Sequence, residues 1–324
     1  MVGGRPLRVL VLDGADHRVL DQLMASGRLP VLDRLRRRGV TVRADTVGGI
    51  FEEAVWPEIF TGEPLGDHAT QHFVRFDPSD HGLLLEREPR GLRPFWSHLP
   101  GGGKGVLAVD IPQLHPDPAS PADHVCGWSA WAAPHPPDPR RSRLRAELGD
   151  PDPSMMREFA AEPSRDDEHR FSAAMAGNAR RRMASVTTPA MRRPVACVGV
   201  HELHGTAHVL GHHWLEDHPH RPWPREPELV TSVYEAVDEA IEGFVSDPDA
   251  NVVVLASQGF TPANSSNPVL EELFVRSGLA AGPASGDGGE QAGGGGRALD
   301  PMALLRRWMS PELRERLATR VLPE

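Results

Sequence analysis

Short continuous apolar runs alternate along this chain with segments of helical periodicity. The runs are LRVLVL (7–12), GVLAVD (105–110), PVACVGV (194–200) and NVVVL (251–255), and they are typical of strands buried on both faces. Helical patterns cover residues 17–26, 30–38, 154–184 and 228–245, with a short helix at 56–61 and a further strand at 40–44. This alternation predicts an α/β fold with a mostly parallel central sheet and helices on both faces.

Two segments interrupt the periodic pattern. Residues 112–153 are rich in Pro, Asp, His and Trp, which indicates an irregular cap or loop insertion over the carboxyl edge of the sheet. The run AGPASGDGGEQAGGGG begins at residue 281 and is typical of a flexible linker. We therefore expect one α/β domain over residues 1–280, a Gly-rich linker over 281–297 and a C-terminal helical segment over 298–324.

The composition of the chain limits the partners and the cellular location that we expect. The chain has 324 residues and a net charge of −10, which argues against nucleic acid as a partner. The arginine runs 34–38 and 180–182 are expected on solvated helix faces. No run of eighteen apolar residues or N-terminal secretion signal is present, so we expect a cytoplasmic protein without a membrane span. Cys126 and Cys197 are then expected to be buried free thiols.

Ligands of parallel sheets bind outside the carboxyl ends of the strands. Asp13 stands at such an end, and a buried carboxylate there needs a partner. Asp16 is better placed than Asp13 to cap the helix that follows, so we expect Asp13 to be a ligand or a catalytic group. Ser257 and Gln258 stand at another strand end, although they are poor acids, bases and metal ligands.

The segment HELHGTAHVLGHHWLEDHPH (201–220) holds seven of the sixteen histidines. His204, His208 and His212 are spaced by four, which places them on one face of a helix. Two neutral imidazoles on one face can share a divalent metal, and Glu202 precedes them at the strand end. A polar, partly exposed helix is the alternative, but this density of histidines favours a metal or phosphate site.

A third candidate lies in FEEAVWPEIFTG (51–62). Glu52 and Glu53 precede an aromatic-rich helical turn that contains Trp56. Acidic residues in a first turn also suit the helix dipole, so a structural and a functional role are equally open for them.

The order of these motifs resembles the alkaline phosphatase superfamily, in its type I phosphodiesterase/nucleotide pyrophosphatase branch. The matching segments are VLVLDGAD, GRLPVLDRLRRRG, TGEPLGDHA, HGTAH and VYEAVDEAI, and they extend from residue 7 to about 275. Members with the full motif hold two divalent metals, usually zinc, and attack phosphate or sulfate esters with Thr or Ser. The resemblance implies an alkaline phosphatase-like fold, and metal-ligand roles for Asp13, His204 and His208 with zinc as the cofactor.

The chain departs from that family at several positions. Glu52 stands where the resemblance places the nucleophile, and ASQG (256–259) replaces the SDHG of the relatives, so both late ligands are gone. The last ligand of the family is a histidine nearer the C-terminus, and no histidine follows His220. The chain also stops soon after the linker, where relatives usually continue.

Two functions remain open. The first is a hydrolase of phosphoryl or related esters with an altered, single-metal site, in which Glu52 is a ligand or general base. The residues expected to contact the substrate are Glu202, His212, Gln258 and Trp56. The second is a catalytically degenerate homologue that binds a small phosphorylated or polar ligand, or a protein partner. A homo-oligomer, or a second polypeptide that supplies the C-terminal part, is compatible with both.

Overall fold

The computed structural model describes residues 4–44, 52–68, 74–77, 82–85, 92–112, 114, 119–125, 146, 164–218, 223–257 and 259–262. Only the backbone is described for Glu52, Glu53 and the segments 74–77 and 82–85. The predicted linker and C-terminal segment lie outside the described residues, as do Gln258 and most of the predicted cap.

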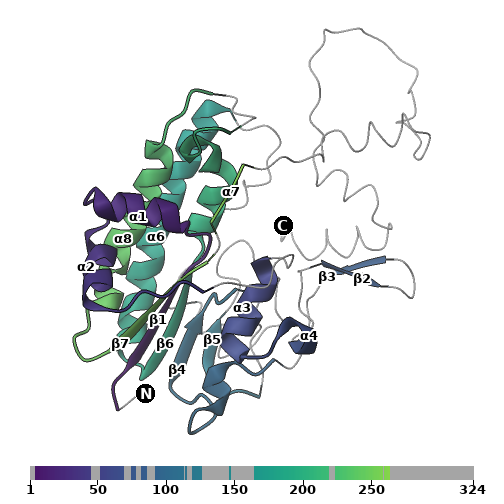
Figure 1. Ribbon diagram of the computed structural model, residues 1–324. Helices are drawn as coiled ribbons and strands as arrows, with labels where there is room; N and C mark the ends of the chain where they lie inside the picture. Colours follow the sequence, from purple (N-terminus) through teal and green to yellow (C-terminus); the bar gives the residue numbers. More distant parts are fainter. Residues whose placement is uncertain are drawn as a thin grey trace.

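A five-stranded parallel sheet forms the centre of the molecule (Figure 1). The strand order is β5-β4-β6-β1-β7, from β1 (Leu7–Leu12), β4 (Val106–Val109), β5 (Asp123–Val125), β6 (Val195–Val200) and β7 (Asn251–Ala256). β1 is flanked by β6 and β7, so that Leu12 is level with Val200 and Ala256. The carboxyl ends of these three strands therefore meet at one edge. A separate antiparallel pair is formed by β2 (Val74–Asp77) and β3 (Gly82–Leu85).

Helices cover both faces of this sheet. They are α1 (His17–Ala25), α2 (Pro30–Arg38), α3 (Glu52–Thr61), α4 (Leu65–His68), α6 (Arg165–Met191), α7 (Glu202–Trp214) and α8 (Glu228–Val245), with a 3₁₀ turn η1 (Phe95–His98). In Figure 1, α1, α2, α6 and α8 lie on one side of the sheet, and α3 and α4 lie on the other. The α/β architecture predicted from the apolar runs is confirmed.

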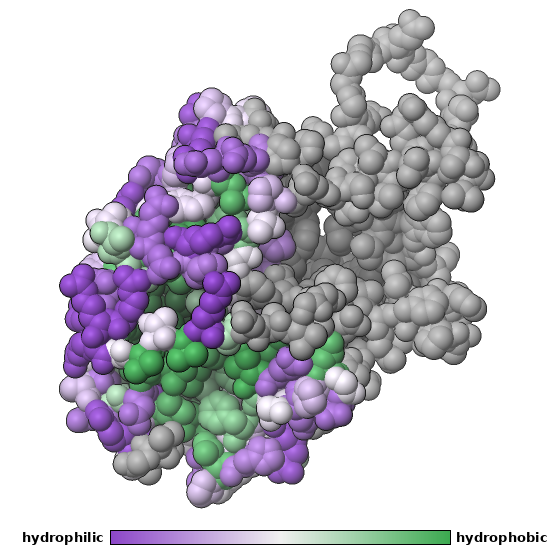
Figure 2. All heavy atoms as spheres, viewed as in Figure 1, coloured by the Kyte–Doolittle hydropathy of each residue, from purple (hydrophilic) through white to green (hydrophobic). Residues whose placement is uncertain are grey.

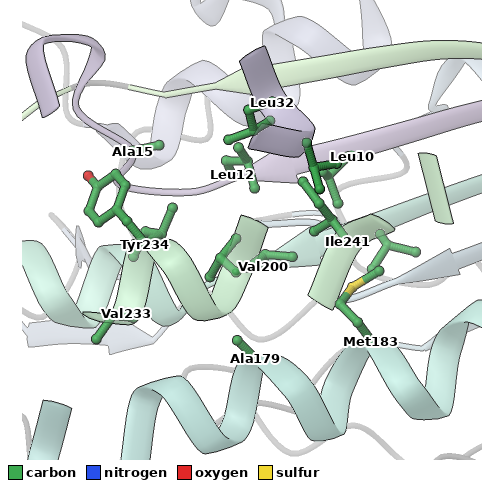
Figure 3. Packing of buried hydrophobic residues seen from close by; sticks show 14 of the residues in the cluster. Leu10, Leu12, Ala15, Leu32, Ala179, Met183, Val200, Val233, Tyr234 and Ile241 are labelled. Carbon is green, nitrogen blue, oxygen red and sulfur yellow. The ribbon is translucent and has the colours of Figure 1, made fainter. Parts of the chain in front are cut away.

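The two faces of β1 belong to two separate cores. Leu10 and Leu12 pack with the helical layer that includes α6 and α8, as the close view in Figure 3 shows. Val9 and Val11 pack on the opposite face with Trp56 and other apolar side chains. Because both faces are covered, β1 has no solvated side, and all of its residues except Arg8 are apolar.

Most predicted elements form, with shifted boundaries. The helix expected at 154–184 is α6, which begins at residue 165 behind a capping box made by Ser164 and Asp167. The helix expected at 56–61 begins earlier, at Glu52. Asp16 is the N-cap of α1, as expected, and its side chain accepts the Arg18 N–H. Cys197 is a buried free thiol, as predicted, whereas Cys126 lies outside the described residues.

Two predictions from the sequence are wrong. The strand expected at 40–44 does not form: Val40 and Val42 are exposed to solvent, with exposed fractions of 91% and 79%, and none of the described strands pairs with them. Arg182 was expected on a solvated face, but its side chain is only 4% exposed. Of the cap segment, residues 123–125 form β5, which extends the sheet beside β4.

The outer surface separates polar from apolar regions. In Figure 2, hydrophilic residues dominate the surface over α1 and α2, and hydrophobic residues gather below them, over the strands. Val253 of β7 is 41% exposed. Within the described part of the chain, no helix combines the length and the apolar character that crossing a membrane requires.

Candidate functional site

The carboxylate of Asp13 is the centre of the polar site at the carboxyl edge of the sheet. Its Oδ1 accepts hydrogen bonds from Trp56 Nε1 and Ser257 Oγ, both at 3.2 Å. Its Oδ2 lies 3.0 Å from His201 Nδ1 and 3.6 Å from His204 Nδ1. Side chains that directly follow β6 and β7, together with side chains of α3 and α7, thus converge on the buried acid at the end of β1.

Gly14 allows α7 to begin directly against the end of β1. Its φ is +75°, and a Cβ at this position would lie 2.3 Å from the Cα of His204. The Gly14 N–H also donates to Ser257 Oγ at 2.7 Å. The Asp-Gly pair of the sequence therefore supplies both the acid and the close approach that brings the histidines of α7 to it.

His201 is a site residue that the i, i+4 spacing of the histidines did not identify. It lies directly after β6, and its ring is buried. Its Nδ1 faces Asp13, and its Nε2 lies 2.7 Å from the main-chain oxygen of Asp110. The signal in the sequence was its place at a strand end, which is the same signal that identified Asp13.

A buried ion network lies beneath this edge. Arg182 of α6 donates from Nη1 to Asp110 Oδ2 at 2.7 Å and from Nε to Glu202 Oε1 at 2.9 Å. The three side chains are between 0% and 4% exposed. Asp110 also has a φ of +48°, which is strained for a residue other than glycine. The network therefore fixes the backbone whose carbonyl group contacts His201.

His204 and His208 lie one turn apart on α7, as predicted. Their rings stack with centroids 4.4 Å apart. His204 is mostly buried beside Asp13, and His208 is exposed. The pair therefore extends the site from the buried acid toward solvent.

A second polar cluster lies at the other end of α7. Glu168 of α6 has Oε1 3.3 Å from His212 Nε2 and Oε2 3.1 Å from His213 Nε2. His212 is eight residues after His204, or about 12 Å along the helix, so this cluster is separate from Asp13. His212 was expected to contact substrate. The structure places it beside Glu168, and its contact with a substrate stays a prediction.

The spacing of this second cluster would allow it to hold a metal ion. Among the described residues, it is the group of three His, Cys, Asp or Glu side chains whose ligand atoms all lie within 4.8 Å of one another: Glu168, His212 and His213. However, His213 Nδ1 accepts the Glu226 N–H, so the neutral ring carries its proton on Nε2 and donates it to Glu168. In this arrangement His213 orients the carboxylate and is not itself ready to be a ligand.

Among the residues whose side chains are described, those at the strand edge bring together two of the three predicted metal ligands. Asp13 and His204 are close enough to share one ion, but Asp13, His204 and His208 do not bring three ligand atoms within 4.8 Å of one another. A catalytic zinc usually takes three protein ligands. Ser257, at a position where the resemblance expects a late ligand, instead donates its hydroxyl proton to Asp13.

The other predicted site residues have distinct positions. Trp56 reaches the site and donates to Asp13. Glu202 is fully buried, with Oε1 on Arg182. Glu52 lies at the start of α3, and its side chain is not described. Gln258 lies outside the described residues. Substrate contacts by Trp56, Glu202 and Gln258 and a catalytic role for Glu52 stay predictions.

Glu168 gives a testable pH dependence. Burial raises its pKa to about 7, the negative charge of Glu226 adds to this, and a hydrogen bond from Trp223 acts in the opposite direction. An unfolded glutamate titrates near pH 4.3, so the native state binds the extra proton between about pH 4.3 and 7. The stability associated with this proton is present below that window and is lost as the pH rises through it.

We therefore expect Glu168→Gln to stabilise the protein on the order of 1 kcal/mol at pH 8 and to have little effect at pH 4. Urea unfolding in the presence of a chelator measures this difference. Glu239→Gln, at an exposed residue paired with Arg180, is the control and should change little at either pH. A loss of stability in Glu168→Gln at pH 8 would mean that the ionised carboxylate is favourable in this cluster.

Comparison with known proteins supports the fold. No protein-family model and no curated protein matches the sequence. The structure is similar to that of phosphonoacetate hydrolase from Sinorhizobium meliloti 1021, solved in complex with phosphonoacetate (TM-score 0.51) and with phosphonoformate (TM-score 0.49). In both comparisons the sequence identity is 18%, and the match covers 84% of this chain and 62% of the hydrolase. The chain thus spans less than two thirds of that protein. The likeness to the phosphonoacetate complex shows that this chain has an alkaline phosphatase-like fold.

Proposed function

We propose that this chain is a hydrolase-fold protein that binds a small phosphorylated or other anionic ligand at the carboxyl edge of its sheet, without two-metal hydrolysis. The observation that carries the proposal is the state of Asp13. Its Oδ1 accepts hydrogen bonds from Trp56 and Ser257, and its Oδ2 lies 3.0 Å from His201 Nδ1. Groups of the chain itself thus contact both oxygens of this carboxylate, which leaves at most one position, on Oδ2, for a metal ion.

The replacements in the sequence agree with this proposal. Glu52 stands where the resemblance places a Thr or Ser nucleophile, so the hydroxyl group that the family uses is replaced by a carboxylate. Ser257 provides a neutral hydroxyl where a ligand is expected, and it connects the end of β7 to the backbone of β1. At these two positions the sequence therefore departs from the nucleophile and the late metal ligand that the resemblance expects.

The ligand-binding surface in this proposal is the pair His204 and His208. Imidazole N–H groups donate to phosphoryl oxygens, and this stacked pair extends from the buried acid to solvent. The hydrolase with the similar fold was solved with phosphonoacetate, so small phosphonates and phosphates are the first ligands to test.

Titration calorimetry of the full chain with phosphonoacetate and with inorganic phosphate tests the binding. We expect saturable binding that weakens at least tenfold, or about 1.4 kcal/mol, in His204→Ala and in His208→Ala. His169→Ala, at an exposed histidine of α6 that contacts Glu226, is the control and should bind as the wild type does. Equal binding by all four proteins, or binding by none, would contradict the proposal.

A metal-assisted hydrolase is the second candidate. It is favoured by the 3.6 Å between Asp13 Oδ2 and His204 Nδ1, a separation that two ligands of one zinc ion can have. In that case Asp13, His204 and His208 would hold the ion, which would lower the pKa of a bound water, and Glu52 would be a general base. An assay with aryl phosphodiesters and monoesters plus zinc distinguishes the two. We expect no turnover, whereas turnover that Asp13→Asn abolishes would establish the hydrolase.

A further inference from the structure

The segment that follows β7 is held against the start of α1 by Asp16. The Phe260 N–H donates to Asp16 Oδ2 at 3.0 Å, and Arg18 Nε donates to Asp16 Oδ1, also at 3.0 Å. The Arg18 guanidinium group donates as well to the main-chain oxygen of Phe260. Asp16 is fully buried, whereas the Arg18 side chain is half exposed. We call the contacts of Asp16 and Arg18 with Phe260 the clamp.

Two glycines give the clamp the space that it needs. A Cβ on Gly259 would lie 2.2 Å from Asp16 Oδ2 and 2.7 Å from its Cγ. The φ of Gly259 is not in the left-handed region, so this position requires glycine because of the carboxylate beside it and not because of its backbone. On the other side, the Phe260 ring packs on Gly211 of α7, where an added Cβ would lie 3.1 Å from Phe260 Cδ2. Residues 259 and 260 are therefore fitted to both α1 and α7.

The clamp lies close in the chain to a side chain of the strand-edge site. Ser257, three residues before Phe260, contacts the end of β1, and its hydroxyl group donates to Asp13 at 3.2 Å. The helix on which the Phe260 ring packs, α7, also carries His204 and His208. The clamp thus joins the ends of β1 and β7 to the helix of the proposed binding surface.

We propose that Asp16 is a positioning residue of the strand-edge site: through the clamp, it keeps Ser257 against Asp13 and fixes the β7 side of the site. This inference rests on the proposed binding function. The two oxygens of Asp16 have separate tasks, because Oδ1 accepts the Arg18 N–H as the N-cap of α1, whereas Oδ2 accepts the Phe260 N–H. A substitution can therefore break the clamp and preserve the cap.

The variant Asp16→Ser separates the two tasks. Serine is a good N-cap, but its hydroxyl group is too short to reach the Phe260 N–H. In amide hydrogen exchange followed by NMR, we expect the Phe260 and Ser257 N–H groups to exchange about tenfold faster in this variant than in the wild type. The Leu20 N–H, which donates to the main-chain oxygen of Asp16 in the first turn of α1, should keep its rate. Unchanged exchange at Ser257 would overturn the inference.

Titration calorimetry of the full chain with phosphonoacetate tests the consequence for the site. We expect Asp16→Ser to bind it about tenfold more weakly than the wild type, because Asp13 and the His204 ring beside it are then held less firmly. Ser164→Ala, which removes the N-cap of α6, is the control for a general loss of stability and should bind as the wild type does. Unchanged binding by Asp16→Ser, although Phe260 exchanges faster, would show that the clamp does not position the site.

The variant Gly259→Ala tests the clamp from the other side and does not require Asp16→Ser to fold. The added methyl group would overlap the Asp16 carboxylate, so we expect the same faster exchange at Ser257 and a lower urea midpoint. In an Asp16→Ala background, the nearest atom left at residue 16 is its Cβ at 3.3 Å, so the same substitution should shift the midpoint much less. Equal shifts in the two backgrounds would refute the clamp.

These measurements separate the failure of this inference from the failure of the proposed function. If the wild type binds neither phosphonoacetate nor inorganic phosphate, the proposed function fails, and the exchange rate of Ser257 still decides whether Asp16 holds it in place. If the wild type binds and His204→Ala does not, but Asp16→Ser binds as the wild type does, the proposed function stands and this inference fails.

Discussion

Replacing Arg182 with methionine is expected to lower the free energy of unfolding by about 3–5 kcal/mol. The guanidinium group is 4% exposed and is paired with Asp110 and Glu202, which are also buried. Without it, two carboxylates remain in the interior with no cation between them, and that cost exceeds the gain from an added apolar side chain. Urea unfolding followed by circular dichroism measures the change.

Arg180→Met is the matched control for this prediction. Arg180 lies two residues earlier on α6 and is paired with Glu239, but both of these side chains are more than half exposed. Its replacement should cost less than about 1 kcal/mol. Adding Asp110→Asn and Glu202→Gln to Arg182→Met should restore part of the lost stability, because it removes the unpaired charges. Equal effects of the Arg180 and Arg182 replacements would show that Arg182 is not a buried ion-pair partner.

The second large effect on stability is expected from a substitution at Gly199 in β6. A Cβ here would lie 2.0 Å from the main-chain oxygen of Asp110 and 2.9 Å from its carbonyl carbon. Both contacts are with backbone, so no side chain can rotate out of the way. We expect Gly199→Ala to destabilise the protein by about 3 kcal/mol or more, because β4 and β6 would have to move apart. The same movement should separate the Asp110 carbonyl from His201, which ring ¹⁵N shifts would report.

Gly177→Ala provides the contrast with Gly199→Ala. Gly177 is inside α6, and the nearest atom to an added Cβ is Arg181 Nη1 at 3.5 Å, an ordinary contact. Alanine is a better helix former than glycine, so this variant should gain about 0.5–1 kcal/mol. If urea unfolding shows that Gly199→Ala is tolerated as well as Gly177→Ala, the close approach of β6 to Asp110 is not a real constraint.

The sequence was informative where one local pattern decides the structure. The run before Asp13 is apolar at every position except Arg8 because β1 is covered on both faces, so its strand, its burial and its polar end could all be predicted. By contrast, residues 40–44 also have apolar and β-branched side chains, but whether they pair depends on a neighbour that the local pattern does not specify. Val40 has none in the described sheet.

Only part of the site could be predicted, again because local patterns are visible in the sequence and contacts between distant segments are not. The spacing of His204 and His208 follows from helix periodicity and was visible in the sequence. The role of His201 depends on two acceptors that arrive from β1 and β4, which are distant in the sequence. Arg182 belongs to a charged run of the kind that usually faces water, and only the packing of α6 against the ends of β4 and β6 shows that one of its three arginines is inside.

The central position of β1 has a consequence for how the protein is made. β1 is synthesised well before its two neighbours, β6 and β7, and synthesis must reach residue 256 before both exist. At about 5–20 residues per second, β1 waits for β7 for roughly 12–50 s. During this time β1 lacks at least one of its two neighbours, and unpaired strand edges of this kind promote aggregation. Of the residues that contact Asp13, Ser257 is synthesised last, so the polar site is complete only after β7 has been made.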